Sequence, residues 1–231
     1  MTDIRAVIFD MDGCLVDSEP MSLQTLAQMM AAEGLDTNMD ELRRRFLGVS
    51  IQSIVSHIAE VLERDDLPDF ARTFEERLLA RYPAELQVIP GIPALLDDLA
   101  SHGVAVAIAT GSSVRRLGIT LQVAGLTDRF GAMIFSADQV RHGKPAPDLF
   151  LLAAERLGIP PHACAVMEDS PHGITGARAA GMRAVGFVGG SHLHGMQDDH
   201  ARRLTDAGAA TVLSDLTGMT TALLDRQARG A

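Results

Sequence analysis

The sequence predicts an α/β fold, in which a doubly wound parallel sheet forms the core and a helical domain is inserted near the N-terminus. Three observations support this prediction. Short apolar segments rich in β-branched residues recur along the chain, helical patterns separate them, and one long stretch near the N-terminus has helical patterns only. Parallel strands that are buried on both faces have this continuous apolar character, and their alternation with helices is typical of sheets covered on both sides.

Five short apolar segments are predicted to be the strands of this sheet. They lie at residues 4–9, 104–109, 133–135, 163–167 and 184–188. Each is too short for a typical helix and is followed by polar or small residues. The first segment ends abruptly at Asp10, which makes the end of that strand the best-defined boundary in the sequence.

Apolar residues at helical spacing lie between the predicted strands. Leu95 and Leu99 share a face of one predicted helix, which ends before Gly103. A second helix is predicted over residues 149–157 and ends at Gly158. Glycine is common just after the last turn of a helix, so both ends are well marked.

The inserted domain is predicted over residues 17–83, which leaves 1–16 and 84–231 for the core that contains the sheet. Two apolar stripes at helical spacing run through the insertion, and no segment in it has the pattern of a strand. Thr37 and Asp40 have the spacing of a capping box, so we expect a helix to begin there.

The composition excludes a general nucleic-acid-binding surface. The chain has a formal net charge of −10, one Tyr and no Trp. It therefore has neither an overall basic character nor a set of aromatic side chains for stacking on bases. An anionic substrate must be held by local positive charges.

No apolar segment approaches the roughly 20 residues that a helix needs to cross a bilayer. Asp3, Arg5 and Asp10 interrupt the only candidate signal segment, so a cytoplasmic protein without membrane contact is expected. Cys14 and Cys164 have no spacing typical of a zinc site or a disulfide framework, and both are interpreted as free thiols. The sequence does not indicate an oligomeric state.

Four acidic residues follow predicted strands. Asp10 and Asp12 come after the first strand, and Glu168 and Asp169 after the fourth. In an open α/β sheet, ligands bind beyond the carboxyl ends of the strands, so these side chains are expected to converge. Converging carboxylates repel one another unless a cation lies between them, and oxygen ligands suit Mg²⁺. The simpler explanation is that each acid only caps the loop or helix that follows it.

Two further segments have the residues expected of a phosphate site. Thr110 and Gly111 follow the second predicted strand, where a hydroxyl group and backbone amides can surround phosphate oxygens. Lys144 lies between Gly143 and Pro145, in a stiff turn that directs its side chain.

These residues lie in four ordered motifs that together resemble the haloacid dehalogenase superfamily, in the branch containing β-phosphoglucomutase and the sugar-phosphate phosphatases. The matching segments are residues 10–19, 109–112, 144–148 and 168–173. The resemblance implies a Rossmann-like core with a helical cap that determines substrate specificity. Cys14 is a departure, because many members have Thr at that position, and it places a thiol close to the site.

The resemblance implies a Mg²⁺-dependent phosphatase that acts on a small phosphorylated metabolite. Asp10 would be the nucleophile that becomes an aspartyl phosphate, and Asp12 the general acid and base. Mg²⁺ would be held by Asp10, the backbone carbonyl of Asp12, Asp169 and, directly or through water, Glu168.

Further residues are assigned to the phosphate and the substrate. Lys144 has a catalytic role, because it holds phosphate oxygens on which charge concentrates in the transition state. The residues assigned to substrate binding are Thr110, Gly111, Ser112, Glu19 and Ser50. Sugar, polyol and sugar-acid phosphates all remain open as substrates.

A phosphomutase would use the same core residues and is the main competing hypothesis. The β-phosphoglucomutase-like pattern has an Arg and a His where this chain has Ile51 and Ser22. Both differences remove groups that a mutase would use, although Arg77 or Arg81 could supply a cation from another helix of the insertion. We therefore expect a hydrolase.

A dehalogenase and a non-catalytic binding protein are less favoured. A dehalogenase does not need the second acid at Asp12 or the magnesium cluster, and a binding protein would not need every catalytic position filled. His192, His194 and His200 follow the last predicted strand in a Gly-rich segment. We expect this segment to form a mobile loop near the mouth of the site rather than a second metal site.

Overall fold

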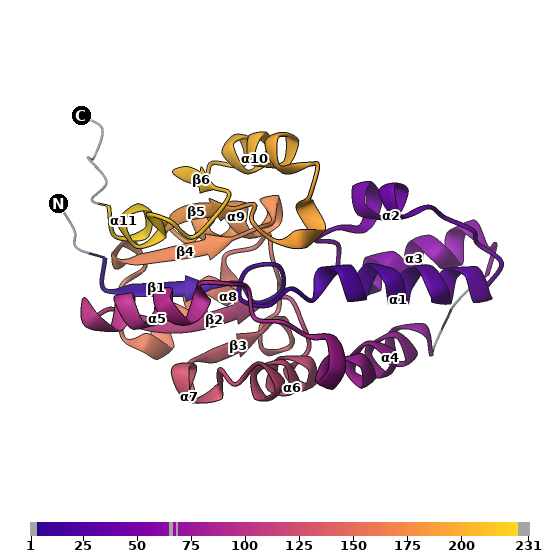
Figure 1. Ribbon diagram of the computed structural model, residues 1–231, viewed down its shortest axis with the longest axis horizontal. Helices are drawn as coiled ribbons and strands as arrows, with labels where there is room; N and C mark the ends of the chain where they lie inside the picture. Colours follow the sequence, from indigo (N-terminus) through magenta and orange to yellow (C-terminus); the bar gives the residue numbers. More distant parts are fainter. Residues whose placement is uncertain (1–3, 65–66, 68, 226–231) are drawn as a thin grey trace. The chain divides into compact units, whose positions relative to one another are not determined.

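The computed structural model describes residues 4–64, 67 and 69–225 and consists of two compact units. The core unit comprises Met1–Asp17 and Gln87–Ala231, and the helical unit comprises Ser18–Leu86. The chain leaves the core unit after its first strand and returns to it before the second, so the helical unit is an insertion (Figure 1). The boundaries predicted from the sequence were residues 17 and 83.

Six parallel strands form the sheet of the core unit, in the order β3-β2-β1-β4-β5-β6. This arrangement confirms the predicted α/β fold. The strands are β1 (Ala6–Phe9), β2 (Ala105–Thr110), β3 (Ile134–Ser136), β4 (Cys164–Glu168), β5 (Arg183–Phe187) and β6 (Thr211–Leu213). The first five lie within two residues of the predicted segments. The sixth was not predicted, because it has three residues, all of them partly exposed.

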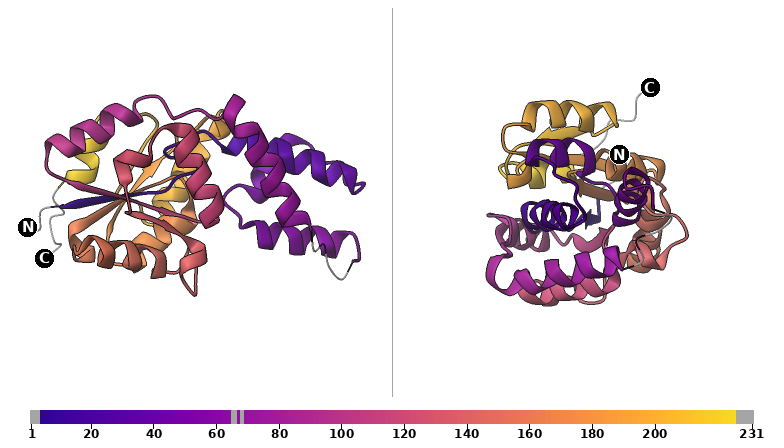
Figure 2. Two further views of the ribbon diagram at one scale, coloured as in Figure 1. Left: turned by 90° about the horizontal axis from the view of Figure 1, so that it is seen from below. Right: turned by 90° about the vertical axis from the view of Figure 1, so that its right-hand side faces the viewer.

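Helices cover both faces of this sheet (Figure 2). The helices of the core unit are α5 (Ile92–Ser101), α6 (Val114–Ala124), α7 (Thr127–Phe130), α8 (Asp148–Leu157), α9 (Pro171–Ala179), α10 (Gln197–Asp206) and α11 (Met219–Leu224). Parallel strands are joined by right-handed crossovers, so the reversal of direction after β3 places α8, α9 and α10 on the face opposite to α5, α6 and α7. Contacts between α8 and α9, between α9 and α10, and between α5 and α11 agree with this division.

The central strands β1 and β4 form the floor of the core. All residues of both strands are buried, and β1 is fully inaccessible. Phe9 packs edge-on against Phe130 of α7, with their ring centroids 6.1 Å apart. In the register of the sheet, Phe9 pairs with Ile108 of β2 on one side and with Met167 of β4 on the other. Asp10 therefore emerges between the carboxyl ends of β2 and β4.

Four helices form the helical unit: α1 (Glu19–Ala32), α2 (Met39–Phe46), α3 (Ile51–Val61) and α4 (Phe70–Glu85). Leu42, Ile58, Leu78 and Tyr82 are fully buried in it. The predicted capping box at Thr37 and Asp40 is wrong. Asn38 caps α2 instead, and its side-chain oxygen accepts a hydrogen bond of 2.8 Å from the backbone N–H of Glu41. The same spacing occurs one residue later, and Asn is a stronger N-cap than Thr.

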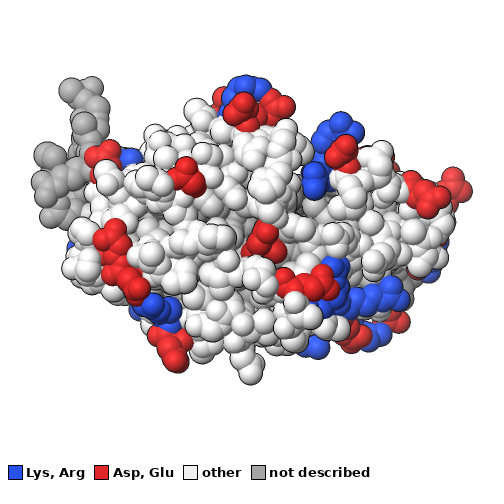
Figure 3. Space-filling view, viewed as in Figure 1, with Lys and Arg blue, Asp and Glu red and all other residues white. Residues whose placement is uncertain are grey.

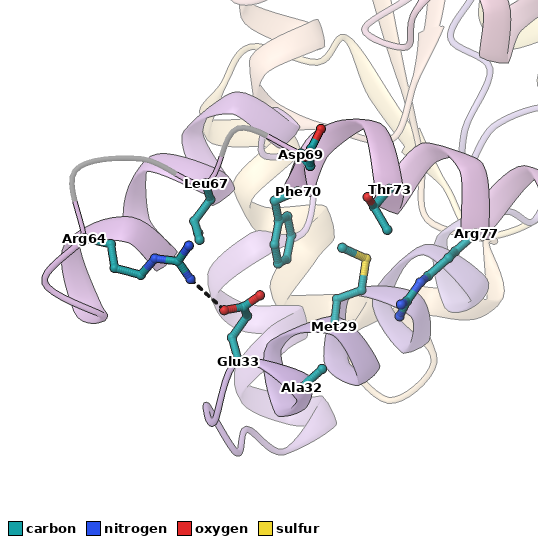
Figure 4. A pocket seen from close by; sticks show the side chains of 9 residues that line it. All are labelled: Met29, Ala32, Glu33, Arg64, Leu67, Asp69, Phe70, Thr73 and Arg77. Atoms are coloured by element: carbon teal, nitrogen blue, oxygen red, sulfur yellow. Dashed lines mark hydrogen bonds and ion pairs between the residues drawn. The ribbon is translucent and has the colours of Figure 1, made fainter.

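The helical unit also contains a cavity of about 260 Å³ between α1, α4 and the segment before α4 (Figure 4). Met29 and Phe70 give it an apolar wall, and Arg77 extends along one side. Glu33 and Arg64 form an ion pair of 2.8 Å at its edge. The cavity is therefore amphipathic rather than a continuation of the apolar core.

Several exposed charges form ion pairs within one helix. Arg43 and Arg45 of α2 form loose ion pairs with Asp40 and Glu41, at 4.0 and 3.8 Å. On the face shown in Figure 3, Lys and Arg side chains lie among Asp and Glu side chains. Within the described part of the chain, no helix combines the length and the apolar character that a membrane span requires.

The burial of β1 leads to a stability prediction. Ile8→Ala should lower the free energy of unfolding of the core unit by about 2–5 kcal/mol, because it leaves a cavity at a fully buried position. Leu151→Ala on α8 is the matched control, since Leu151 is 40% exposed and its truncation should change this free energy by about 0.5 kcal/mol. Urea unfolding followed by circular dichroism suits a chain with one Tyr and no Trp. Equal losses in the two variants would contradict this description of the core.

Candidate active site

Polar side chains gather where three neighbouring strands end. Asp10 follows β1, Thr110 is the last residue of β2, and Glu168 is the last residue of β4. Their exposed fractions are only 7%, 1% and 0%. Because buried polar groups require partners, their burial at one edge of the sheet indicates a built site rather than a surface feature.

Lys144 joins two of these acids. Its Nζ donates to Asp10 Oδ1 at 2.6 Å and also contacts the Glu168 carboxylate. The Lys144 side chain is 10% exposed, and its ammonium group lies 5.4 Å from the centre of the Phe150 ring. Burial opposes the charged ammonium, but Asp10 and Glu168 outweigh it and raise the pKa of Lys144. The residue is therefore a fixed positive charge between two carboxylates.

A compact group of possible metal ligands lies beside this lysine. In the described part of the chain, ligand atoms of Asp10, Cys14 and Asp169 lie within 4.8 Å of one another. Burial raises the pKa of Asp10 to about 7, Lys144 opposes this shift, and Glu168 and Asp12 add to it. Burial and the Asp10 charge also raise the pKa of Asp169. Buried, mutually repelling carboxylates of this kind fit a divalent cation, and their oxygen atoms suit a hard one.

Glu168 and Cys14 have different surroundings in this site. The Glu168 carboxylate contacts Lys144 and accepts a hydrogen bond of 3.1 Å from the backbone N–H of Ser170, and it is not part of the compact group. Burial and the neighbouring carboxylates raise the pKa of the Cys14 thiol. This thiol is therefore a neutral neighbour of the two aspartates.

Two glycines allow the backbone to approach the carboxylates. A Cβ atom at Gly13, where φ is +77°, would lie 2.1 Å from Asp169 Oδ2. A Cβ atom at Gly173 would lie 1.8 Å from Glu168 Oε1. Both distances are far below van der Waals contact, so any side chain at either position would displace an acid of the site.

Asp12 is held by two donors. The hydroxyl group of Ser112 donates to Asp12 Oδ2 at 2.7 Å, and Arg116 Nη2 donates to Asp12 Oδ1 at 2.6 Å. Arg116 was not predicted from the sequence. It lies in the first turn of α6, four positions after Ser112, and this proximity to the second motif was the available signal.

The turn after β2 is partly closed on itself. The Ser112 N–H donates to Thr110 Oγ1 at 3.1 Å, and the Ser112 carbonyl accepts from the hydroxyl group of Ser136 at 2.6 Å. The Ser112 amide, which was expected to face a phosphate oxygen, is therefore engaged within the turn. Gly111 is exposed, and a Cβ atom there would contact nothing within 4 Å.

The segment after β5 is not the loop that the sequence suggested. His192 lies in a short 3₁₀ turn at Ser191–Leu193, and His200 lies in α10. Both side chains are buried. His192 Nε2 lies 3.1 Å from Asp169 Oδ2, and His200 Nε2 lies 2.6 Å from the Asp169 carbonyl oxygen. His194 alone of the three is exposed. The sequence pattern predicted a loop here because glycine-rich segments are typical of loops.

The remaining predicted site residues belong to the helical unit. Glu19 is the first residue of α1. Ser50 caps α3, and its hydroxyl oxygen accepts a hydrogen bond of 3.2 Å from the Ser53 N–H. Their contacts with a substrate stay predictions.

The acid cluster leads to a prediction about stability and pH. Because burial raises the pKa of Asp10 from 3.8 to about 7, the folded state binds more protons than the unfolded state between these values. The Asp10 contribution is therefore most favourable below pH 4 and is lost as the pH rises toward 7. In chelator, wild-type protein should lose at least about 2–4 °C more in Tm between pH 5 and 7.5 than Asp10→Asn, which corresponds to about 1 kcal/mol. Thermal melting measures this difference, and identical pH profiles would contradict the proposed charge burial.

Comparison with known proteins places this site in a family. Residues 4–181 match the model of the haloacid dehalogenase-like hydrolases. The chain is 33% identical over 211 residues to a phosphorylated carbohydrates phosphatase from Thermotoga maritima, and the match covers 91% of this chain and 94% of that protein. It is 36% identical over 182 residues to the fructose-1-phosphate phosphatase YqaB of Escherichia coli, with 78% and 94% covered.

Two solved structures show the same arrangement over nearly their whole length. A conserved haloacid dehalogenase-like protein from Agrobacterium tumefaciens has a TM-score of 0.80 at 34% identity, with 94% of this chain and 96% of that chain covered. A family hydrolase from Deinococcus radiodurans, solved with bound phosphate and sodium, has a TM-score of 0.76 at 33% identity, with 96% and 99% covered. The chain thus belongs to the haloacid dehalogenase-like hydrolases, in their β-phosphoglucomutase-like and sugar-phosphate phosphatase branch.

Proposed function

We propose that this hydrolase is a Mg²⁺-dependent phosphatase that hydrolyses a small sugar, polyol or sugar-acid phosphate monoester through an aspartyl phosphate on Asp10. The observation that carries the proposal is the contact of Lys144 with Asp10 inside a buried group of carboxylates at the carboxyl edge of the sheet. A cytoplasmic location stays a prediction.

Asp10 is the proposed nucleophile. A carboxylate oxygen of Asp10 attacks phosphorus, and the bond between phosphorus and the alkoxide of the substrate breaks, which leaves an aspartyl phosphate. The buried ammonium group of Lys144, 2.6 Å from Asp10, fixes the carboxylate and offsets the charge of an incoming phosphate. Water then attacks the phosphorus, and inorganic phosphate leaves with Asp10 regenerated.

Asp12 is the proposed acid and base. It gives a proton to the departing alkoxide and takes one from the attacking water, so one carboxyl group serves both steps. Ser112 and Arg116 fix its two oxygens.

Asp10 and Asp169 would hold the metal ion, together with the backbone carbonyl of Asp12 and, directly or through water, Glu168. When bound, Mg²⁺ supplies the positive charge that the buried carboxylates and a phosphate dianion share. Gly13 has no side chain, and this leaves room for the Asp169 carboxylate in the site.

The substrate class rests on the relatives and on the helical unit. The names of two relatives, a phosphorylated carbohydrates phosphatase and a fructose-1-phosphate phosphatase, support a phosphorylated sugar or polyol. The helical unit would recognise the alcohol part, and its loop at residues 48–51 has no charged side chain. Such a loop suits a hydroxylated carbon chain better than a second phosphate.

The cations that a mutase would require in the helical unit are only partly available. Arg81 forms a bidentate ion pair with Glu85 and donates to the Thr25 hydroxyl group, the Gln24 side chain and the Met21 carbonyl. These contacts engage its guanidinium group in holding α4 against α1. Arg77 lines the cavity of the helical unit.

The covalent mechanism predicts the effect of removing the nucleophile. Asp10→Asn should lower phosphate release from an aryl phosphate by at least about 10³-fold, the scale expected when a covalent nucleophile is lost, while the fold is retained. Asp128→Asn makes the same chemical change at an exposed position of α7 and should leave turnover unchanged. Near wild-type turnover in Asp10→Asn would refute the aspartyl-phosphate step.

Hydrolase and mutase are separated by following two products. With Mg²⁺, β-glucose 1-phosphate and a trace of the 1,6-bisphosphate, we expect inorganic phosphate and little glucose 6-phosphate, because the loop around Ile51 lacks a cation for the distal phosphate. A panel of sugar, hexitol and pentitol monophosphates then identifies the preferred substrate. Efficient isomerisation with little phosphate released would show that the protein is a mutase and not a hydrolase. The proposed roles of Asp10 and Asp12 would be unchanged.

A further inference from the structure

The compact group of possible metal ligands in the site includes a thiol that the proposed reaction does not use. We propose that Asp10, Cys14 and Asp169 form a site for a soft divalent cation such as Zn²⁺, in which Cys14 binds the ion as a thiolate. The inference goes beyond the proposed function, which assigns Mg²⁺ to oxygen atoms only and gives Cys14 no role.

The three ligand atoms are close enough to bind one ion. In the described part of the chain, a carboxylate oxygen of Asp10, the sulfur of Cys14 and a carboxylate oxygen of Asp169 lie within 4.8 Å of one another. Zn²⁺ lies about 2.3 Å from sulfur and about 2.2 Å from carboxylate oxygen, so two of its ligand atoms can lie up to about 4.5 Å apart. Small side-chain adjustments therefore suffice to bring all three onto one ion. Three protein ligands and a water molecule are a common coordination of zinc.

The Asp169 carboxylate is buried, with a side chain that is 10% exposed. His192 Nε2 lies 3.1 Å from its Oδ2 atom but not in hydrogen-bond geometry. Within residues 4–64, 67 and 69–225, no N–H or O–H group donates a hydrogen bond to this carboxylate. Lys144 donates to Oδ1 of Asp10 at 2.6 Å, so the second Asp10 oxygen can bind an ion. A buried carboxylate without a donor is stabilised by a cation.

The turn that carries Cys14 holds the thiol beside these carboxylates. The turn closes on the Met11 carbonyl oxygen, which accepts hydrogen bonds from the N–H groups of residues 14–16. Gly13 lies so close to Asp169 that a Cβ atom there would be 2.1 Å from Oδ2. Cys14, the next residue, is fully buried. The two aspartates of the group keep exposed fractions of 7% and 8%, so an ion can reach the thiol past them.

The sulfur atom determines which ions this site prefers. Mg²⁺ binds oxygen ligands, whereas a thiolate favours Zn²⁺ and other soft ions. When such an ion binds, the S–H bond of Cys14 breaks, the proton passes to the solvent, and a sulfur electron pair forms the bond to the ion. No electron is transferred. Two carboxylates alone suit a hard ion, so Cys14 is the residue that extends the site to soft ions.

The test follows the bond between the ion and the sulfur atom. Cd²⁺ is titrated into protein that has been dialysed against chelator, in a phosphine reductant that leaves the ion free. A Cd²⁺–thiolate bond has an ultraviolet charge-transfer band that histidine and carboxylate ligands do not produce. We expect this band to reach its full intensity with one Cd²⁺ per chain, and added Zn²⁺ should remove it by displacing Cd²⁺.

The two cysteines of the chain give a matched pair of variants. Cys14→Ser should lose the band, whereas Cys164→Ser should keep both the band and the wild-type Kd. Cys164 is also buried, but its sulfur lies 3.6 Å from the Pro160 carbonyl oxygen and belongs to no group of three possible metal ligands among the described residues. Asp169→Asn keeps the thiol and should raise the Kd for Cd²⁺ at least about tenfold, since even residues that only support a ligand contribute about 10- to 100-fold to affinity.

Melting in chelator checks the fold of each variant, and Cys14→Ala, with the same expected loss, replaces Cys14→Ser if the latter does not fold. The inference is overturned if the wild type shows no band, or if the band persists without the Cys14 thiol. An unchanged Cd²⁺ titration in Asp169→Asn also overturns it, because the thiol would then bind the ion alone. Phosphate release with Mg²⁺ tests the proposed function and is measured without Cd²⁺, so the proposed function and this inference can fail separately.

Discussion

The contact of Lys144 with Asp10 and Glu168 is the interaction on which the site depends. It places one positive charge among several carboxylates in a region closed to solvent, where an unpaired charge is costly. The pairing is incomplete, because burial still raises the pKa of Asp10 to about 7 and raises those of Glu168 and Asp169. The ionised carboxylates therefore repel one another in the folded protein. A bound cation would reduce this repulsion, so the same carboxylates favour cation binding.

The parallel sheet makes this concentration of charge possible. Because β1 lies between β2 and β4, the residues that follow or end these strands meet without long loops. The buried apolar residues of β1 and β4 keep the edge rigid, and Gly13 and Gly173 let the backbone pass within contact distance of the acids. The order of the strands therefore accounts both for the buried apolar core and for the close spacing of the acidic side chains at the carboxyl edge of the sheet.

Much of the core could be predicted from the sequence, because its signals are local. The strand that ends just before Asp10 is continuous and apolar, and the residues of the first, second and fourth motifs lie at or directly after the ends of strands. Contacts between distant segments were not predictable in this way. Arg116 reaches Asp12 from α6, and His192 reaches Asp169 from the segment after β5. Local patterns also misplaced the start of α2, because Thr37 and Asn38 offer caps one residue apart and Asn is the stronger N-cap.

The arrangement around Asp12 bears on the kind of bond that this hydrolase cleaves. A halide leaves without a proton, so a dehalogenase does not need a second acid held near the nucleophile. An alkoxide leaves poorly unless it is protonated, and a site for phosphate esters requires a carboxyl group at that place. Here Ser112 and Arg116 hold both oxygens of Asp12, two residues after Asp10, and the pair is largely buried. A carboxyl group fixed beside the proposed nucleophile suits a leaving group that must be protonated, as the alkoxide of a phosphomonoester is.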